Sequence, residues 1–499
     1  MTDSNSNYSD LPQGWKIVQL QDIAEINPKL PYTDLDDSLI VSFLPMASVE
    51  EVSGKYDLSQ TRLYGEVKKG YTAFINGDII FAKITPCMEN GKIAIVENLQ
   101  NGIGFGSTEF HVSRIKLGLN KRYLFYYFTQ ASFKREARRN MTGSAGQLRV
   151  SKKYFESVEI SLPPLPEQHR IVEKIEELFS ELDNGVASLK KALEQLKTYR
   201  QAVLKWAFEG KLTEKWRNTH QDSLEDADSL LEQIKAERKR HYQQQLEDWK
   251  KALKEWENNG KETKKPIKPQ QPKDLPPLTK EELSNLPSLP DGWMWVKVDY
   301  LLSLDKKGMT TGPFGTLLKK SEHQISGIPV LGIENIGNGV FLPKNKIFIT
   351  EKKARELSSF EVSGGDIIIS RSGTVGEICL VPDYFGYSLI STNLIRISLN
   401  KTIISPKFFV FLFLGGGSVR EQVKELCKGS TRDFLNQTIL QTIIFPFPSL
   451  QEQTQIVQEI ESRLSVCDQL EATLTENLDK AEALRQSILK RAFEGKLVL

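Results

Sequence analysis

The stretch Arg200 to Leu212 reads RQAVLKWAFEGKL, and the stretch Arg485 to Leu497 reads RQSILKRAFEGKL. A match this long is not expected by chance, so the chain of 499 residues is predicted to contain a tandem duplication. Further pairs keep nearly the same order along the chain: LPQGW (Leu11 to Trp15) with LPDGW (Leu289 to Trp293), GDIIFAK (Gly77 to Lys83) with GDIIISR (Gly365 to Arg371), and Glu167-Gln168 with Glu452-Gln453. A two-fold tandem of this size differs from a solenoid and is typical of a protein that meets two similar targets.

Each half begins with a region of mixed secondary structure. Residues 13 to 160 alternate short apolar runs, such as IIFAKI (Ile79 to Ile84) and KIAIVE (Lys92 to Glu97), with Gly and Asn-Gly turns. This pattern predicts short strands joined by hairpins. The run LPPLP (Leu162 to Pro166) is predicted to end the domain, because proline cannot continue a helix or a central strand.

Each half then ends with a long helical pattern. From Glu167 to Gly210, and again from Glu452 to Gly495, apolar residues recur at three- and four-residue spacing. At about 1.5 Å per residue, each stretch predicts a helix of roughly 65 Å. Two such apolar stripes most simply bury each other. An antiparallel pair would place the duplicated domains at opposite ends and a parallel pair at one end; the stripes alone leave both arrangements open.

An insertion separates the two halves. Asp222-Ser223 is expected to cap a helix that runs to Asn259-Gly260. The following stretch KKPIKPQQPKDLPPL (Lys264 to Leu278) is expected to be an extended linker. We interpret the insertion as a spacer helix with a tether, and a docking element for a partner is the alternative.

The composition indicates a globular protein without a strong preference for a charged partner. The hydrophobic content is 39%, the charged content is 26% and the formal net charge is +2. The four cysteines lie far apart, which favours reduced thiols in a cytosolic protein. The first ten residues are polar, and no apolar run approaches the roughly 20 residues of a membrane span. We therefore expect a cytoplasmic protein without a membrane partner.

The sequence carries no recognisable catalytic motif. It has no GxxxxGK[ST] loop for a nucleotide, and its five histidines show neither HxxxH spacing nor a neighbouring cysteine. Ser144 and Ser430 lie in Gly-Ser turns without a recurring His or Asp, so they do not indicate a nucleophile. The chain is predicted to bind rather than to catalyse, with no catalytic residue, metal or cofactor of its own.

Both mixed regions contain side chains that can bind DNA. Arg and Lys read guanine, Asn and Gln suit adenine, and phosphate contacts position a domain without specifying sequence. The candidate DNA-binding residues are Lys83, Asn90, Lys92, Thr108, Arg138, Arg139, Ser144, Gln147, Arg149 and Lys152 in the first half, and Thr311, Lys319, Lys320, Asn335, Arg371, Ser372, Thr374, Asn393, Ser430, Thr431, Arg432 and Asn436 in the second. For any single residue a solvated surface role is the alternative. The recurrence of such residues in both halves is stronger evidence for a binding role than any one of them. Lys83 and Arg371, for example, hold the same position after the GDII run.

The ordered set of motifs resembles the specificity subunit of type I restriction-modification systems, over nearly the whole chain. The resemblance rests on LPxGW at both domain starts, KITPCMENGKIA (Lys83 to Ala94), GFGSTEFHV (Gly104 to Val112), GPFG (Gly312 to Gly315) followed by Lys319-Lys320, ISRSGTVGE (Ile369 to Glu377), and PxPxxEQ-type entries into helices that end in AFEGKL.

The resemblance implies an α/β (α+β) fold, in which two pseudo-repeated mixed target-recognition domains are joined by two long antiparallel coiled-coil-like helices. The expected boundaries are 1–162 for the first target-recognition domain, 163–215 for the first spacer helix, 216–288 for the insertion helix and Pro/Lys-rich linker, 289–448 for the second target-recognition domain and 449–499 for the second spacer helix.

The resemblance also implies a non-catalytic subunit whose domains each read one half of an asymmetric, interrupted site in double-stranded DNA. Two methyltransferase (modification) subunits that modify adenine, and restriction/translocase subunits, would join it. S-adenosylmethionine, ATP and Mg²⁺ are expected in those partners. The candidate partner-binding residues are Trp206, Phe208, Arg491 and Phe493.

Two departures between the halves imply different target sequences. The first half lacks GPFG, and its Gly-Ser turn continues AGQLRV where the second continues TRDFLNQ. A structural adaptor whose two domains bind proteins is the main alternative to a DNA-reading subunit. A stand-alone nuclease is a further alternative, and the missing metal and nucleotide motifs argue against it.

Overall fold

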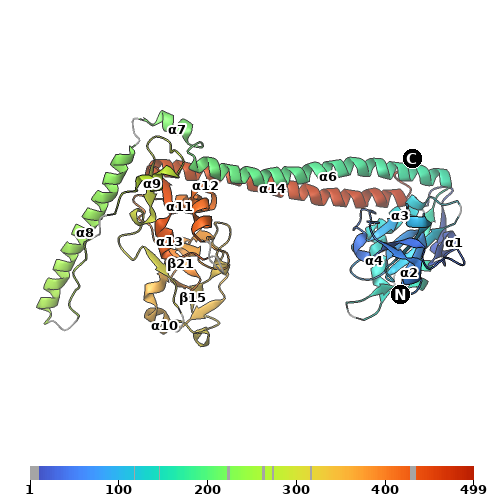
Figure 1. Cartoon of the computed structure of the whole chain (residues 1–499), viewed down its shortest axis with the longest axis horizontal. Helices are drawn as coiled ribbons and strands as arrows, with labels where there is room; N and C mark the ends of the chain where they lie inside the picture. The colour runs from blue at the N-terminus through green and yellow to red at the C-terminus, as the bar shows by residue number, and fades with distance from the viewer. Residues whose placement is uncertain are drawn as a thin grey trace. The chain divides into compact units, whose positions relative to one another are not determined.

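The computed structural model describes residues 11–116, 118–144, 146–221, 225–260, 264–271, 275–314, 317–427 and 434–498. The chain divides into two compact units: Met1–Ala192 with Thr473–Leu499, and Leu193–Ala472. Each unit contains one mixed domain and a part of both long helices, α6 (Leu165–Phe208) and α14 (Leu450–Phe493), each of 44 residues (Figure 1). Within the described ranges, no helix is long and apolar enough to cross a membrane.

The mixed domain of the first unit is built on two four-stranded sheets with the orders β2-β9-β6-β7 and β4-β3-β8-β5. Its strands are β1 (Lys16–Gln19), β2 (Ala24–Ile26), β3 (Ile40–Leu44), β4 (Thr61–Leu63), β5 (Thr72–Ile75), β6 (Ile79–Ala82), β7 (Ile93–Ile95), β8 (Ile103–Gly106), β9 (Phe110–Ile115), β10 (Met141–Thr142), β11 (Arg149–Val150) and β12 (Glu159–Leu162). Its short helices are α1 (Leu20–Ile23), α2 (Tyr64–Val67), α3 (Lys121–Thr129), α4 (Ala131–Arg139) and α5 (Lys152–Glu156). Strand β1 pairs antiparallel with β12, so the start and the end of the domain lie together.

The second unit repeats the two four-stranded sheets of the first, with the orders β14-β21-β18-β19 and β16-β15-β20-β17. Its strands are β13 (Met294–Lys297), β14 (Met309–Thr311), β15 (Ile328–Leu331), β16 (Ile347–Ile349), β17 (Glu361–Val362), β18 (Ile367–Ser370), β19 (Ile378–Leu380), β20 (Ser388–Ile390), β21 (Leu394–Ile397) and β22 (Ile444–Phe447). Its helices are α10 (Glu351–Glu356), α11 (Pro406–Gly415), α12 (Gly417–Leu426) and α13 (Gln437–Thr442). The GDII runs form the inner strands β6 and β18, all of whose residues are buried. The predicted duplication is therefore present in the fold.

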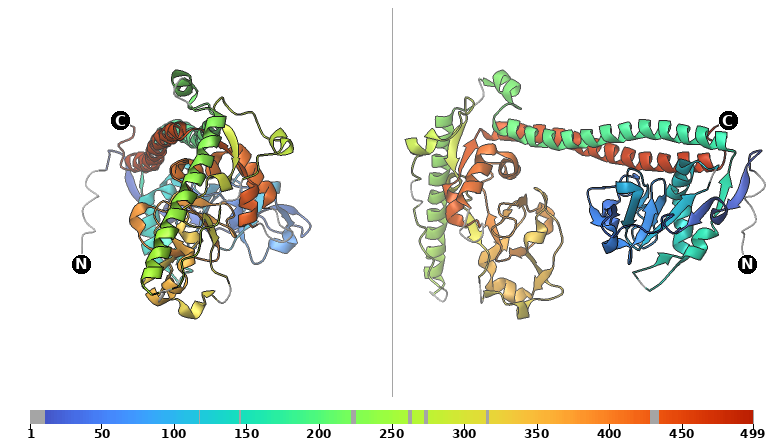
Figure 2. Two further views of the ribbon diagram at one scale, coloured as in Figure 1. Left: turned by 90° about the vertical axis from the view of Figure 1, so that its left-hand side faces the viewer. Right: turned by 45° about the vertical axis from the view of Figure 1, so that its right-hand side comes forward.

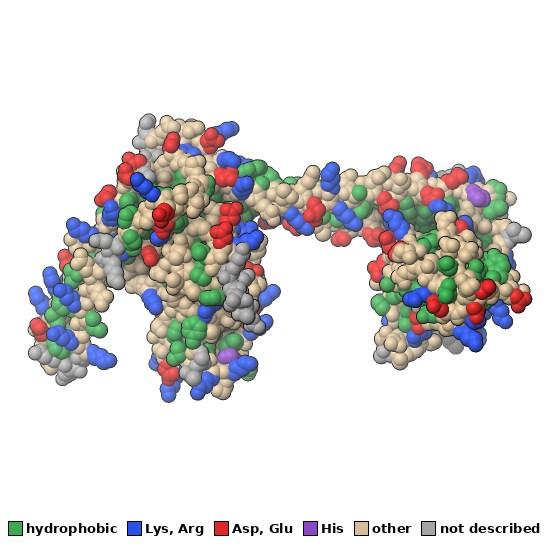
Figure 3. Space-filling view, viewed as in Figure 1, with side chains coloured by type: hydrophobic (Ala, Val, Ile, Leu, Met, Phe, Trp, Pro, Cys, Tyr) green, Lys and Arg blue, Asp and Glu red, His purple; other side chains and the backbone are tan. Residues whose placement is uncertain are grey.

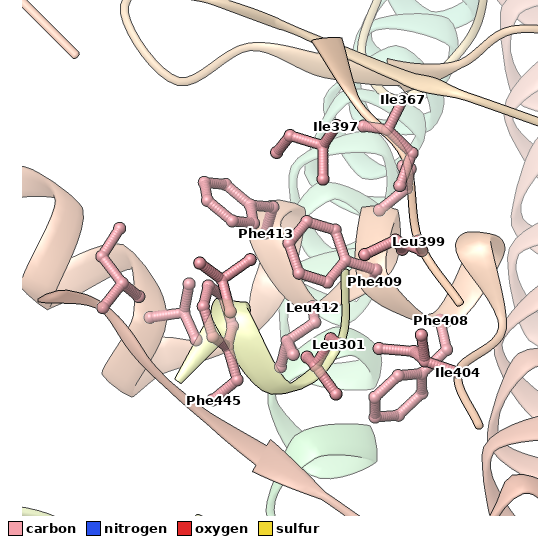
Figure 4. Close-up of a cluster of buried hydrophobic side chains, with 14 of the residues drawn as sticks. Leu301, Ile367, Ile397, Leu399, Ile404, Phe408, Phe409, Leu412, Phe413 and Phe445 are labelled. Atoms are coloured by element: carbon pink, nitrogen blue, oxygen red, sulfur yellow. The ribbon is translucent and has the colours of Figure 1, made fainter. Parts of the chain in front are cut away.

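Helix α11 supplies much of the core of the second unit. Ser405 caps the helix and Pro406 follows in its first turn, where a missing N–H costs nothing. Phe409 and Phe413 are buried beside Phe445 of β22, with 5.2 Å between the ring centroids of Phe409 and Phe445 (Figure 4). This apolar helix thus closes one face of the sheet that contains β18.

The long helices pack against each other in both units, and they run antiparallel. In the first unit Asp183 of α6 forms an ion pair with Arg485 of α14. In the second unit the later residue Arg200 of α6 binds the earlier residue Asp468 of α14, at 2.6 Å. The chain direction is therefore opposite on the two helices, as the fold prediction stated, and Figures 1 and 2 show the two ribbons side by side.

The repeated AFEGKL motif ends each helix on the mixed domain of the other half. Gly495, at the end of α14, lies against Pro12 of LPQGW, and Gly210, at the end of α6, lies against Pro290 of LPDGW. Both glycines have φ of +70°, and a Cβ at either position would overlap the proline ring. The two motifs recur together because they form one contact twice.

A tryptophan from each LPxGW motif binds the start of the helix that follows its own domain. The Trp15 indole N–H donates to Glu167 at 3.0 Å, and the Trp293 indole N–H donates to Glu452 at 2.9 Å. These bonds fix the first turn of each long helix to the beginning of its domain.

The glutamine next to each glutamate makes a second link. Gln168 accepts the backbone N–H of Asn120 at 2.9 Å and donates to the carbonyl of Pro163 at 2.9 Å. Gln453 makes the same two bonds in the second unit. The Glu-Gln pair is therefore a structural motif at the two helix starts.

The insertion forms α7 (Glu214–Thr219), α8 (Ala227–Asn258) and α9 (Lys280–Ser284). Asp226 caps α8 with a side-chain bond to the N–H of Ser229 at 2.7 Å, whereas the expected cap Asp222-Ser223 lies outside the described residues. Leu230 and Ile234 are buried against the core of the second unit. The linker returns along the helix, where the Trp249 indole donates to the carbonyl of Pro266 at 3.0 Å. Figure 3 shows Lys and Arg side chains over the far part of α8.

Candidate nucleic-acid interface

In the first domain, three predicted segments meet at one end of the β9-β6 pair. The Lys83 N–H donates to the carbonyl of Glu109 at 2.9 Å, and the Val150 N–H donates to the carbonyl of Lys83 at 2.8 Å. The Arg149 guanidinium binds the Glu109 carboxylate through one bidentate fork, with Nη2–Oε1 at 2.8 Å and Nε–Oε2 at 3.0 Å. The structure thus brings together two predicted cations, Lys83 and Arg149, around a carboxylate.

The electrostatics of this cluster follow from the ion pair and from burial. Hydrogen bonds from Arg149 hold the pKa of the Glu109 carboxyl below its ordinary value. Burial lowers the pKa of the Lys83 ammonium group, and the nearby Glu109 carboxylate acts in the opposite direction. Burial also lowers the pKa of His111 to about 4, so this ring is neutral near pH 7. Arg149 is therefore held at the domain surface by a carboxylate that stays ionised.

The second domain repeats the backbone frame of this cluster. The Arg371 N–H donates to the carbonyl of Asn393 at 2.9 Å, and the Leu435 N–H donates to the carbonyl of Arg371 at 2.9 Å. The same two bonds in the first domain join Lys83 to Glu109 and to Val150, which defines the equivalent positions. Arg371 replaces Lys83, Asn393 replaces Glu109 and Phe434 replaces Arg149.

Further segments converge on Arg371. Its guanidinium carbon lies 4.9 Å from the ring centroid of Phe314, which follows β14. The Ser372 hydroxyl donates to the Asn393 amide oxygen at 3.0 Å. Gln437 at the start of α13 donates to the Thr311 hydroxyl at 2.8 Å. Four of the predicted residues, Thr311, Arg371, Ser372 and Asn393, thus lie in one cluster.

The remaining candidates of the first half are more dispersed. Asn90 donates to Glu51 at 2.7 Å, Arg138 pairs with Glu89, and Lys152 pairs with Glu156 at 3.4 Å. Lys92 donates to the backbone carbonyls of Met46 and Val49, at 3.2 and 2.9 Å, so it stabilises a loop of its own domain. The side chains of the other candidates are exposed: Thr108, Arg139, Ser144 and Gln147.

In the second half the structure corrects one prediction and qualifies another. Asn335 is fully buried, and its amide binds the Gly332 N–H, the Leu342 carbonyl and Asn345, so it is not available to DNA. Asn436 caps α13 by accepting the Ile439 N–H at 2.8 Å, which occupies its amide oxygen. The exposed candidates are Lys319, Lys320 and Thr374, and the candidates Ser430, Thr431 and Arg432 lie outside the described residues.

The structure corrects the prediction for two of the four candidate partner-binding residues, Phe208 and Phe493. Phe208 packs on Phe408 with ring centroids 5.5 Å apart, and Phe493 packs on Tyr123 at 4.9 Å. Both phenylalanines are buried in the domain cores, so their contacts are with their own chain. Trp206 and Arg491, which occupy equivalent positions in the repeat, are exposed.

Sequence reasoning missed Glu109, Phe314 and Phe434 because it searched for hydrogen-bond donors and cations. A signal was present in the tripeptides Ser107-Thr108-Glu109 and Ser391-Thr392-Asn393, which hold the same place before β9 and β21. Among the residues with described positions, no group of three or more His, Cys, Asp and Glu side chains could hold a metal ion. The clusters offer cations, amides and hydroxyls, which suit recognition of a polar polyanion.

The family model of the type I restriction modification DNA specificity domain matches residues 12–196 and 295–480. The chain belongs to this family. The specificity subunit of the type I restriction enzyme EcoEI from Escherichia coli is 30% identical, over 96% of this chain and 83% of that protein. The EcoAI specificity subunit from the same species is 33% identical, over 72% of this chain and 62% of the relative. This chain is accordingly a non-catalytic specificity subunit of a type I restriction-modification system.

Solved structures of similar fold support the architecture of this specificity subunit. The HsdS subunit from Thermoanaerobacter tengcongensis matches with a TM-score of 0.55 and 19% identity, over 99% of this chain and all of the other. A chain from a structure that describes complex assembly and conformational transition of the type I R-M system matches with a TM-score of 0.66 and 19% identity, over 97% of this chain and 99% of the other. At this identity the likeness shows the fold, which agrees with the predicted fold class.

Proposed function

We propose that this specificity subunit reads a bipartite, asymmetric DNA site, with one half read by each mixed domain. The observation that carries the proposal is a repeated backbone frame with unlike side chains. Lys83, Glu109 and Arg149 in the first domain are replaced by Arg371, Asn393 and Phe434 in the second. A shared frame supports the same mode of approach to DNA, and different side chains support different base preferences.

The proposal includes the partners that complete the reaction. Modification subunits would methylate adenine with S-adenosylmethionine, and restriction subunits would use ATP and Mg²⁺. In the first unit the paired helices leave a groove of about 450 Å³ that is lined by Leu178, Leu182, Leu484, Ile488 and Arg491, among others. An apolar groove of this kind suits an amphipathic helix of another subunit.

The test is to co-express the chain with its modification subunit and to map methylated adenines across the genome of the host cell. We expect a motif of two unlike specific halves separated by unspecified bases. Replacing residues 289–448 with those of a relative should change one half of the motif and leave the other half unchanged.

Three outcomes would contradict this proposal. A continuous or palindromic motif would argue against two independent readers. A change in both halves after replacement of one domain would show that the domains do not read separately. An adaptor that binds only proteins would leave the methylation pattern unchanged after the replacement.

A further inference from the structure

Arg371 stacks on an aromatic ring and has no acidic partner among the residues that the structure describes. Its guanidinium lies on Phe314, whose side chain stays 53% exposed although it is aromatic. Its Nε atom is buried and has no hydrogen-bond partner among the residues that the structure describes. A stacked guanidinium is planar and pre-oriented, so it loses little freedom when it binds a second planar group.

The first domain shows how the same frame can instead neutralise an arginine. There Glu109 accepts both donors of one fork of the Arg149 guanidinium. The second domain has the amide of Asn393 at the position of Glu109, and this amide oxygen accepts the Ser372 hydroxyl. The exchange of a carboxylate for an amide removes the charge that would hold a guanidinium to the protein.

The chemistry of the major groove then selects a base. A guanidinium fork offers two parallel donors, and guanine offers two adjacent acceptors, O6 and N7. Adenine and cytosine present an amino donor at the equivalent place, which a second N–H cannot bind. We propose that Arg371, supported by Phe314, reads a guanine in the half-site of the second domain. This inference rests on the proposed function and adds one base to it.

The experiment uses the chain co-expressed with its modification subunit and the motif found by methylation mapping. Binding is measured on duplexes that carry each base pair in turn at every position of the second half-site. A further duplex carries 7-deazaguanine, which lacks the N7 acceptor. We expect Arg371→Lys to keep the charge but lose roughly 5- to 150-fold preference for guanine at one position. The wild-type complex should lose affinity for 7-deazaguanine at that position alone.

Two further variants test whether the guanine preference depends on the charge beside Arg371. Asn393→Glu restores the carboxylate of the first domain, and it should reduce the guanine preference as Arg371→Lys does. Arg355→Ala is the matched control, because Arg355 lies on α10 with a side chain that is 82% exposed. It should leave every base preference as in the wild type.

The outcomes distinguish the inference from the proposed function. If the wild type has a bipartite motif but no variant changes a guanine preference, Arg371 does not read a base. An equal loss on all sequences with a weaker salt dependence would assign Arg371 to a phosphate. If the wild type has no bipartite motif, the proposed function itself fails.

Discussion

The two domains differ at Glu109 and Asn393, and this difference changes which partner a nearby arginine can have. The Glu109 carboxylate forms a bidentate ion pair with Arg149 at the domain surface. The Asn393 amide carries no charge, and the guanidinium of Arg371 stacks on Phe314. Charge-assisted bidentate bonds are among the strongest polar contacts of proteins. Under the proposed function, specificity would depend on which charged groups are paired within the domain as well as on which are present.

His111 makes the stability of the first unit depend on pH. Its Nε2–H donates to the carbonyl of Val150 at 2.8 Å, and its Nδ1 accepts from the Asn27 amide at 3.1 Å. Burial lowers the pKa of the folded ring from 6.5 to about 4; the charges of Lys83 and Lys152 also lower it, and Glu109 acts in the opposite direction. Between these two pKa values the imidazole is protonated in the unfolded chain but neutral in the folded one. The free energy of unfolding therefore falls as the pH decreases.

Because of His111, we expect the free energy of unfolding to be about 2 kcal/mol lower at pH 5 than at pH 7. Urea unfolding of the first unit at both pH values measures this difference. His111→Gln should be less stable at pH 7 but should show a flatter pH dependence than the wild type. His169→Gln, at an exposed position, serves as the control and should retain the wild-type slope. Equal slopes for the wild type and His111→Gln would show that another group dominates.

At the scale of elements, the two helix starts differ in one buried charge pair. Arg217 of α7 binds Glu452 at 2.7 Å, and the side chain of Glu452 is only 2% exposed. The equivalent Glu167 in the first unit is partly exposed. The insertion therefore supplies the cation that allows the second glutamate to be buried.

Arg217→Ala should destabilise the second unit by about 3–5 kcal/mol, because it leaves the Glu452 carboxylate buried without its cation. Denaturant unfolding followed by the fluorescence of Trp293, which also binds Glu452, measures the change. Lys407→Ala removes the exposed pair with Glu461 and should cost no more than about 1 kcal/mol. Similar losses in the two variants would mean that the buried pair contributes no more than a surface pair.

The sequence predicted the long helices well because their apolar spacing is local and extends over many turns. It also predicted the strands of GDII, where a short apolar run lies between turns. The order of the strands was not accessible, since pairs such as β3 with β8 join distant residues. Phe208 and Phe493 were predicted to bind a partner, because the repetition of AFEGKL indicates a shared role without naming the contact. The sequence does not show that the LPxGW motif of the other half packs on AFEGKL.

Some of the site residues could likewise be predicted from the sequence, and others could not. The shared register of Lys83 and Arg371 was visible after the GDII run, and the structure places both in clusters. Asn335 could not be recognised as a buried loop residue, because its partners depend on the folded turn around it. Glu109 could be compared with Asn393 only after the backbone hydrogen bonds showed that the two residues hold equivalent positions in the two domains.

At the scale of the whole molecule, α6 and α14 are the segments that belong to both units. The ion pairs Asp183 with Arg485 and Arg200 with Asp468 lie in different units, yet both fit one antiparallel register, since a step of 17 residues along α6 matches a step of 17 back along α14. The duplication therefore extends from the domains to the pairing of the helices. If this pair sets the gap of the DNA site, its length is the variable to change.

We expect the accepted gap to grow by close to one DNA turn when 21 residues, three seven-residue repeats, are inserted into both helices, after Leu193 and after Leu474. The insertion adds about 32 Å of helix, against about 34–36 Å for a turn of DNA, so both domains would return to the same face of the duplex. Methylation mapping should show unchanged halves and a gap longer by about 9–10 base pairs. The same insertion into α6 alone shifts Arg200 away from Asp468 and should abolish recognition; an unchanged gap after the double insertion would show that the helices do not set the spacing.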